Sequence, residues 1–541
     1  MTLIEEIQTV FPLAARIPQT LLKGIPCIQT GYLVDGEIRD WDGPQQEVLS
    51  PVWVADDNGD EPFFIGEYPL LTEKEALQAL DAAVAAYDHG RGLWPIMSVA
   101  ERIDHMERFS FRMIEVKERV IQFLMWEVGK SLQDSGKEFD RTLKFITDTL
   151  AALKDLDRVS SRFTIEDGII GQIRRAPMGV VLCMGPFNYP LNETFTTLIP
   201  ALLMGNTVIL KPPKHGALLY APLLSAFCDV FPKGVINIIY GEGRKVIPPL
   251  MASGKINVLG LIGTSTTANA LKKLHPNPNR LRCVLGLEAK NPAIVLKGAD
   301  LDLAVKECVL GCLSFNGQRC TAIKILFVDE SIADTFLERF STAINTLSFG
   351  MPWNEGVFVT PVAEKNKTAY LKKLVLDAVA KGARVVNPAG ATIVGSFFFP
   401  AILYPVHDKM RVYHEEQFGP VIPVLPFNRI DEPITYMINS KYGQQVSIFG
   451  SDPDQIARLI DPLVNQVCRV NINSQCQRGP DTFPFTGRKD SAEGTLSVSD
   501  ALRVFSIRTL VAAKQTDENK MIISSIVRDH KSKFLATDFI L

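Results

Sequence analysis

The sequence has 541 residues, of which 46% are hydrophobic and 22% are charged, and its formal net charge at pH 7 is −3. This composition is ordinary for a globular protein, and the length corresponds to about three or four typical domains. Because both signs of charge are interspersed, there is no electrostatic case for nucleic acid or an anionic membrane, and we expect neither as a partner.

The N-terminus carries acidic residues early and has no continuous apolar core, and no apolar run approaches the about 20 residues that a membrane span needs. The nine cysteines form no Cys-x-x-Cys pair and indicate a reduced set, so we expect a cytoplasmic protein. The seven histidines are dispersed and never stand at ligand spacing from a cysteine, so we expect no metal site.

The predicted elements change character along the chain. The first 70 residues, rich in Gly, Pro and Asp, predict an irregular leader with a few strands. From Thr72 to about Leu153 an apolar period of 3.6 residues predicts helices. From Gly179 onward, short apolar runs that predict strands alternate with helical segments: 179–185, 207–213 and 235–241 for strands, 192–205 and 218–230 for helices.

A second alternating series begins at Ala293 and continues to about Val470, a late strand is expected within 501–514, and the last 25 or so residues predict a polar tail. Apolar strands separated by amphipathic helices are typical of βαβ units on a parallel sheet that is buried on both faces. The fold class is therefore α/β, with two such domains and an accessory element.

Several polar residues stand where chemistry is expected. Cys320, in "NGQRCTA", follows a helical run and stands beside Arg319, whose charge would favour a reactive thiolate; the alternative is an incidental surface cysteine. Asn188, in "GPFNYP", ends a predicted strand, where a side-chain amide can donate to a developing oxyanion; otherwise it is a turn residue.

Three further segments suit an anionic cofactor. Lys211 and Lys214, in "KPPKHG", follow a predicted strand, and a cation there accommodates a 2′-phosphate; the alternative is a pair of solvated lysines. The turns "YGEGRKV" (240–246) and "IGTSTTANA" (262–270) precede helices and suit a pyrophosphate, although neither is a full Gly-x-Gly-x-x-Gly.

Taken in order, these residues resemble the aldehyde dehydrogenase superfamily. The resemblance runs from about Glu73 to Val511 and rests on six segments: "PFNYP", "GNTVILKPP", "LIGTS", "NGQRCTA", "EEQFGPV" and "FPFTGRKDS". It implies a Rossmann-type cofactor domain, an α/β catalytic domain and a β oligomerisation arm. The boundaries that we expect are 1–159 with 177–289 for the cofactor domain, 290–494 for the catalytic domain, and 160–176 with 495–541 for the arm and C-terminal tail.

The resemblance also implies roles for single residues. Cys320 would attack an aldehyde to give a thiohemiacetal and then a thioester, and Asn188 would hold the oxyanion. Lys214 occupies a position where members that prefer NAD often carry an acid, so NADP is the expected cofactor, with NAD possible. The residues expected to bind the cofactor are Lys211, Lys214, Gly241, Gly263, Thr264, Glu416 and Phe418.

Within the superfamily, three segments look most like non-phosphorylating glyceraldehyde-3-phosphate dehydrogenases: "FNYP", "NGQRCTA" and "QRGPDTFPF". Arginines suit a phosphate dianion through their bidentate fork, so we expect a small phosphorylated or acidic aldehyde. The residues expected to contact the substrate are Arg141, Tyr189, Arg319, Thr321 and Arg478.

The segment "VLGLEAKNP" (284–292) departs from the family. Where the superfamily carries the Glu that serves as general base for thioester hydrolysis, this sequence has Gly286, and Glu288 stands two residues later. If both lay on one strand their side chains would share a face, about 6.5 Å apart, and Glu288 would be a displaced base. Alternatively, coenzyme A takes the acyl group, or the chain binds nucleotide and aldehyde with impaired turnover.

The resemblance implies a homodimer or homotetramer, because the strands of the arm, within 160–176 and after Leu496, would otherwise leave exposed edges. The residues beyond Gln515 have no counterpart in the family; they would extend the arm or cover a neighbour's site entrance.

Overall fold

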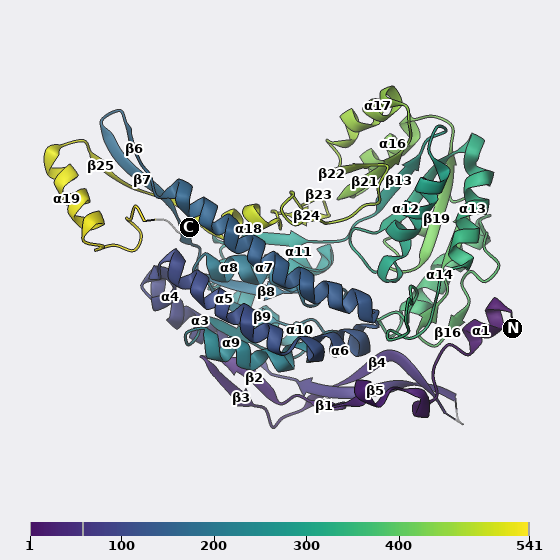
Figure 1. Cartoon of the computed structure of the whole chain (residues 1–541), viewed down its shortest axis with the longest axis horizontal. Coiled ribbons are helices and arrows are strands. Elements are labelled where there is room, and N and C mark those ends of the chain that lie inside the picture. Colours follow the sequence, from purple (N-terminus) through teal and green to yellow (C-terminus); the bar gives the residue numbers. More distant parts are fainter. Residues whose placement is uncertain (1, 57–58, 539–541) are drawn as a thin grey trace.

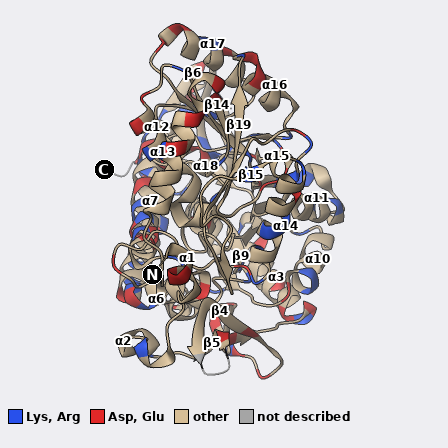
Figure 2. Ribbon diagram, turned by 90° about the vertical axis from the view of Figure 1, so that its right-hand side faces the viewer, with Lys and Arg blue, Asp and Glu red and all other residues tan. Residues whose placement is uncertain are grey.

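The computed structural model describes residues 2–56 and 59–538. Figure 1 shows two α/β bodies side by side, with a strand-and-helix arm projecting from one of them. No helix within the described ranges is long and apolar enough to cross a membrane. Figure 2 shows Lys and Arg interspersed with Asp and Glu over the helices, in keeping with the small net charge of −3.

The first body is built on an eight-stranded sheet with the order β24-β12-β11-β8-β9-β10-β2-β3. Its five central strands pair in parallel, and their apolar side chains are almost all buried, as expected for a sheet with helices on both faces. They are β8 (Val180–Met184), β9 (Thr207–Lys211), β10 (Ile236–Ile238), β11 (Val258–Ile262) and β12 (Arg282–Gly286).

The edges of this sheet come from distant parts of the chain and pair antiparallel. They are β2 (Gly31–Val34) and β3 (Glu37–Asp40) at one edge and β24 (Ala492–Glu493) at the other. The N-terminal leader is thus more regular than the sequence predicted. The segment that reaches the expected boundary at 494 returns to pair with β12, so the two bodies are joined through a strand.

Helices cover this sheet as the 3.6-residue periodicity predicted (Figure 1). They include α3 (Glu73–Tyr87), α5 (Val99–Glu115), α6 (Lys117–Val128), α7 (Leu132–Ser160), α8 (Asn192–Leu203), α9 (Leu224–Val230), α10 (Gly243–Ala252) and α11 (Ser265–Leu274). Two of them begin with a capping box, Thr72 with Glu75 for α3 and Ser98 with Glu101 for α5, which satisfies N–H groups of the first turn.

The second body has a seven-stranded sheet with the order β15-β18-β19-β14-β13-β21-β22, parallel except for β15. Its strands are β13 (Asn291–Val295), β14 (Ile323–Asp329), β15 (Arg384–Val385), β18 (Ala401–Tyr404), β19 (Val421–Phe427), β21 (Gln445–Phe449) and β22 (Arg469–Ile472). Its helices include α12 (Leu301–Leu313), α13 (Ala333–Asn345), α14 (Lys367–Ala380), α16 (Asp431–Asn439) and α17 (Pro453–Leu463).

The N-terminal region also contributes a long hairpin of β4 (Gln45–Asp56) and β5 (Gly59–Pro69), flanked by β1 (Cys27–Ile28). Helix α1 (Leu3–Gln8) lies against β16 (Ile393–Val394) of the second body (Figure 1). The first residues of the chain therefore contact the second body, although the sequence placed them with the first.

The arm is a three-stranded antiparallel sheet with the order β25-β7-β6. Its strands are β6 (Phe163–Glu166), β7 (Ile169–Pro177) and β25 (Ser506–Lys514), and α18 (Val498–Val504) leads into β25. The polar tail forms a helix, α19 (Asp517–Arg528), and then folds back onto β7, where the Gln172 side chain donates to the Ala536 carbonyl at 2.6 Å. The tail thus extends the arm of its own chain.

Candidate active site

Cys320 lies on a strained loop between α12 and β14. Three consecutive residues before it, Phe315, Asn316 and Gly317, have φ of 48°, 57° and 70°, a region that side-chain-bearing residues rarely adopt. A Cβ on Gly317 would stand 2.6 Å from the Cys312 carbonyl oxygen, so only glycine fits there. The carbonyl oxygen of Cys320 accepts from Asn291 Nδ2 at 2.8 Å and Lys324 Nζ at 3.0 Å, which fixes the loop.

The environment of the thiol differs from the sequence prediction. Burial raises the pKa of Cys320, the charge of Glu193 raises it further, and the nearby cations Lys324 and Arg478 only oppose this. The expected thiolate-favouring neighbour, Arg319, instead donates through Nη2 to the carbonyls of Leu310 (3.1 Å) and Gly311 (3.0 Å) near the end of α12. The prediction of a lowered pKa was therefore wrong, because sequence adjacency did not place the guanidinium beside the sulfur.

Asn188 is brought to the cysteine loop by the segment that follows β8. Its side-chain Nδ2 donates to the backbone carbonyl of Gln318 at 2.8 Å, and the residue is buried. A side-chain amide carries two N–H groups, so this bond orients the amide and leaves one N–H to donate elsewhere. The predicted oxyanion donor and the predicted nucleophile thus lie on two loops that hydrogen-bond to each other.

A fully buried ion pair holds the Asn188 loop. Lys130 and Glu138 bond to each other, and Lys130 Nζ also donates to the Asn188 carbonyl at 2.7 Å. Glu138 Oε1 accepts from the backbone N–H groups of Leu191 and Asn192, each at 3.1 Å. Such a pair is costly to bury unless its hydrogen bonds are satisfied, and here they fix the backbone around Asn188.

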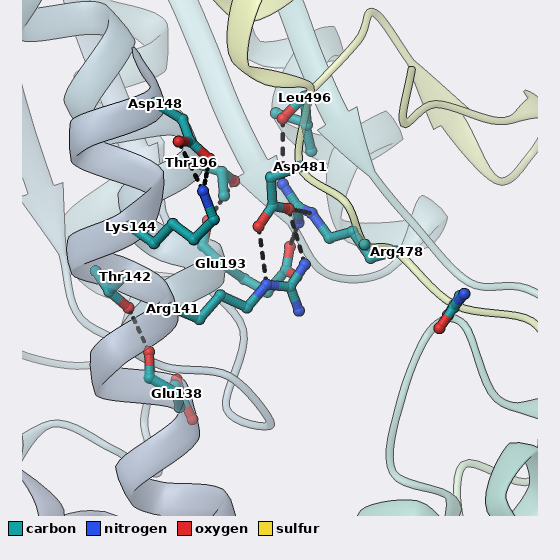
Figure 3. Close-up of polar contacts among 12 residues, drawn as sticks. Glu138, Arg141, Thr142, Lys144, Asp148, Glu193, Thr196, Arg478, Asp481 and Leu496 are labelled. Atoms are coloured by element: carbon teal, nitrogen blue, oxygen red, sulfur yellow. Dashed lines mark hydrogen bonds and ion pairs between the residues drawn. The ribbon is translucent and has the colours of Figure 1, made fainter. Parts of the chain in front are cut away.

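Two of the predicted substrate arginines converge, and Figure 3 shows them reaching toward the same carboxylate. Arg141, on α7, makes a bidentate ion pair with Asp481 at 2.9 and 2.8 Å. Arg478 donates to Asp481 through Nε at 3.1 Å, to Glu193 through Nη1, and to the Leu496 carbonyl through Nη2 at 3.1 Å. All three nitrogens of Arg478 are therefore engaged, whereas Arg141 keeps Nη1 available and a third of its side chain exposed.

The other predicted substrate residues are Tyr189, Arg319 and Thr321. Tyr189 is half-buried, Lys130 Nζ lies 3.6 Å from its ring centre, and burial raises its pKa while the charges of Arg319 and Arg141 lower it. The guanidinium groups of Arg319 and Arg141 thus lie near the Tyr189 phenol. Arg319 Nε is buried without a hydrogen-bond partner among the described residues, and Thr321 is buried next to the thiol in the chain.

The cofactor residues lie at the carboxyl edge of the eight-stranded sheet. Lys211 ends β9 and is buried, and burial together with the charge of Lys214 lowers its pKa to about 8. Lys214 is exposed, and within the described part of the chain neither lysine forms an ion pair. Two adjacent ammonium groups without a carboxylate partner fit a phosphorylated ligand.

The two glycine turns differ in what the structure supports. Gly241 has φ of 117°, and a Cβ there would meet the Leu71 carbonyl oxygen at 2.9 Å, so packing against Leu71 already explains this glycine. Gly263 follows β11, and Thr264 caps α11 by accepting from the Thr267 backbone N–H at 3.2 Å. The first turn of α11 therefore opens at the carboxyl edge of the sheet, where a phosphate was expected.

Glu416 and Phe418 approach from the second body. Glu416 accepts from the Ala289 backbone N–H at 3.1 Å and pairs with Lys324 Nζ at 2.5 Å, so it links the 286–290 segment to the cysteine loop. Phe418 makes an edge contact with Phe187, with ring centres 5.8 Å apart. Through Lys324, which also donates to the Cys320 carbonyl, the predicted cofactor residue Glu416 is connected to the cysteine loop.

The sequence suggested that Glu288 and Gly286 share a strand, but in the structure they do not. Strand β12 ends at Gly286, and the Glu288 carboxylate turns to α11, where it accepts from Ser265 N at 2.8 Å and Ser265 Oγ at 3.3 Å. The atoms nearest to a Cβ on Gly286 would be those of Ile262 and Leu496 at 3.4–3.5 Å, so a Cβ fits there.

The comparison with known protein families matches residues 59–511 to the "Aldehyde dehydrogenase family". The chain belongs to the aldehyde dehydrogenase family. The expected fold class and the expected oxidoreductase acting on aldehydes are thereby confirmed.

Two relatives and one solved structure illustrate the similarity of this aldehyde dehydrogenase to known members. The NADP-dependent glyceraldehyde-3-phosphate dehydrogenase of Streptococcus equinus is 31% identical over 461 residues, which cover 84% of this chain and 92% of the relative. The lactaldehyde dehydrogenase of Methanocaldococcus jannaschii is 28% identical over 456 residues, covering 83% and 95%. The structure of NADP-dependent glyceraldehyde-3-phosphate dehydrogenase from Bacillus halodurans C-125, complexed with NADP, has a TM-score of 0.82 at 30% identity and covers 90% of this chain and all of that one.

The aldehyde dehydrogenase site contains charged residues that the sequence did not single out: Lys130, Glu138, Glu193, Lys324 and Asp481. A signal existed for Asp481, because it follows Arg478 by three residues in "QRGPDTF". Glu193 and Lys324 read as ordinary helix and strand residues, and only the folded chain shows that they act on the thiol. Among the described residues no group of three or more His, Cys, Asp and Glu side chains is placed to hold a metal.

Proposed function

We propose that this aldehyde dehydrogenase oxidises a small acidic aldehyde to the carboxylic acid with NADP, and that glyceraldehyde 3-phosphate is the first substrate to test. One observation carries the proposal: Asn188 Nδ2 is bonded to the cysteine loop at the Gln318 carbonyl, two residues before Cys320. An oriented amide beside a nucleophile is the arrangement that acyl chemistry at a thiol requires.

In the proposed mechanism the Cys320 thiol loses its proton to solvent and its sulfur adds to the aldehyde carbonyl. The resulting thiohemiacetal carries an oxyanion, and the free N–H of Asn188 donates to it. Preorganised donors of this kind contribute on the order of 3 kcal/mol to the transition state. Lys130 and Glu138 keep Asn188 in place, and the bonds of Asn291 and Lys324 to the Cys320 carbonyl keep the nucleophile in place.

The residues that would hold the cofactor are Lys211 and Lys214, with the first turn of α11 as the expected phosphate position. The nearby cationic charge of two lysines suits a 2′-phosphate and favours NADP over NAD. When bound, the dinucleotide supplies the hydride acceptor that converts the thiohemiacetal into a thioester.

The acidic substrate is supported by the arginine cluster, though not through all of its members. Arg478 is held by Glu193, Asp481 and the Leu496 carbonyl, so we assign it to shaping the pocket. Arg141 Nη1, the Tyr189 hydroxyl and the Nε and Nη1 of Arg319 form none of the hydrogen bonds between described residues, and we propose that they bind the anionic group of the aldehyde.

A second function is favoured by Gly286. The usual carboxylate is missing there, and Glu288 is engaged by Ser265. Transfer of the acyl group to coenzyme A needs no such base and remains the second candidate. The third is a protein that binds nucleotide and aldehyde with impaired turnover.

A rapid-mixing assay with NADP⁺ and glyceraldehyde 3-phosphate, with and without coenzyme A, tests these proposals. Steady formation of reduced cofactor without coenzyme A supports hydrolysis. A burst of about one equivalent per site that stalls until coenzyme A is added supports acylation. If neither a burst nor turnover appears with this or other short acidic aldehydes, the enzymatic proposal is wrong for these substrates. A cytoplasmic location and a homodimer or homotetramer stay predictions, to be checked by fractionation and by sedimentation.

A further inference from the structure

The Glu288 carboxylate occupies the amino end of α11. Its Oε2 accepts from Ser265 N at 2.8 Å, and its Oε1 accepts from Ser265 Oγ at 3.3 Å. Ser265 is the first residue of this ten-residue helix. The first turn of a helix has four N–H groups without helical partners, and a negative charge there is favoured by the helix dipole.

This contact and the helix cap together satisfy two N–H groups of the first turn. Thr264 Oγ1 accepts from Thr267 N at 3.2 Å, while Glu288 takes Ser265 N. Both oxygens of the carboxylate are used, and both by the same residue. Glu288 is therefore held toward α11 by two hydrogen bonds.

The backbone next to Glu288 is also fixed. The next residue, Ala289, donates its backbone N–H to Glu416 Oε1 at 3.1 Å, which fixes the peptide that follows Glu288. The charges that act on Cys320 are those of Glu193, Lys324 and Arg478. The charge of Glu288 acts instead on Tyr442, whose pKa is raised mainly by burial and next by the charge of Glu416.

We infer that Glu288 is a positioning residue of the cofactor half of the site: its carboxylate holds the first turn of α11 and competes with the pyrophosphate of the dinucleotide for Ser265 N–H. This rests on the proposed function, because the dinucleotide at α11 is part of that proposal. A carboxylate and a phosphate oxygen cannot both accept the same N–H, and their like charges repel. Binding of the dinucleotide therefore displaces Glu288.

The test measures the Kd of NADP⁺ by calorimetry for the full chain and for Glu288→Gln and Glu288→Ala. Removing a competing charge lowers the Kd by about 3- to 10-fold at low salt. The advantage of the variants shrinks as salt is added, because screening weakens the repulsion in the parent protein. The matched control is Asp300→Asn, which removes a carboxylate from the amino end of α12, where Asp300 caps Asp302 N and Leu303 N; its Kd for NADP⁺ equals that of the parent.

Adenosine 2′-monophosphate separates the contact from a general charge effect, because it lacks the pyrophosphate. Its Kd is the same for the parent and both Glu288 variants. If the variants bind NADP⁺ with unchanged or weaker affinity while unfolding at the temperature of the parent, Glu288 does not compete and the inference is overturned. An equal gain for adenosine 2′-monophosphate overturns it too. If the parent and every variant fail to bind NADP⁺, the proposed function itself has failed.

Discussion

The two halves of the active site are built differently. On the thiol side three ion pairs are formed within the chain: Lys130 with Glu138, Lys324 with Glu416, and Arg478 with Glu193. On the cofactor side Lys211 and Lys214 form no ion pair within the described residues, and one lies buried. The thiol side is thus preorganised by the fold, whereas the cofactor side is completed by its ligand. Such preorganisation is what a reaction at a fixed nucleophile requires.

The largest effect expected breaks the thiol side outright. Cys320→Ala removes the sulfur that we propose forms the acyl bond, so formation of reduced cofactor falls by on the order of 10⁴-fold or more. Stopped-flow absorbance of reduced cofactor measures this. Cys228→Ala, a half-buried cysteine on α9, is the control and keeps its burst. A substantial burst in the Cys320 variant would show that another group is the nucleophile.

The second prediction restores a carboxylate where the two halves meet. Gly286→Glu places a base at the position where the family carries one, and a Cβ fits there, with its nearest contacts at 3.4–3.5 Å. If thioester hydrolysis limits turnover, the steady-state rate without coenzyme A rises by about 10- to 100-fold. Gly286→Gln has the same size without the charge and gives no gain. Equal rates for both variants would mean that hydrolysis is not limiting.

The third prediction tests how the thiol side sets the nucleophile. Because the pKa of Cys320 is raised, the burst rate increases with pH through the alkaline range as the thiol loses its proton. Glu193→Gln removes a charge that raises this pKa, so the rising limb moves to lower pH. Stopped-flow pH profiles measure the shift, and Asp148→Asn on α7 leaves the limb in place. A limb that stays put in the Glu193 variant would contradict the assignment.

The smallest expected effect concerns Lys211, on the cofactor side. With a pKa lowered to about 8, the Lys211 ammonium is present below that pH and is lost as pH rises through it. Affinity for NADP⁺ is therefore highest near neutral pH, and the Kd rises by about 3- to 10-fold by pH 9.5. Lys211→Arg keeps its charge throughout and flattens the profile. A parent Kd independent of pH would show that Lys211 is not a contact of the cofactor.

The sequence predicted the elements that have local signals and missed the contacts between distant residues. The buried strands β8 and β9 and helix α8 were predictable because continuous apolar runs and 3.6-residue periods are local signals. Asn188 and Cys320 were singled out from short motifs, and their roles stay predictions. The sequence did not predict the direction of the Arg319 side chain or the raised pKa of Cys320. Both depend on which distant groups the fold brings near these two residues.

Glu288 shows the limit most clearly. The sequence showed that the carboxylate stands two residues later than in the family. We expected this segment to be a strand, in which the Glu288 side chain would lie on the same face as position 286 and act as a displaced base. The strand ends at Gly286, and the Glu288 carboxylate instead accepts the Ser265 N–H in the first turn of α11. Helix α19 was missed for a different reason: its capping residue, Thr516, and its apolar residues lie in a tail whose composition reads as polar.

The fold-back of the tail has a practical consequence for anyone who produces this protein. The carbonyls of Phe534 and Ala536 accept from Arg174 and Gln172, and Gln172 is fully buried in the arm. An affinity tag fused directly to the C-terminus, or a version cut after Lys514, would disturb a strand 360 residues away rather than a loose end. Purification and assembly studies should therefore use a cleavable tag, with the sedimentation profile checked before and after its removal.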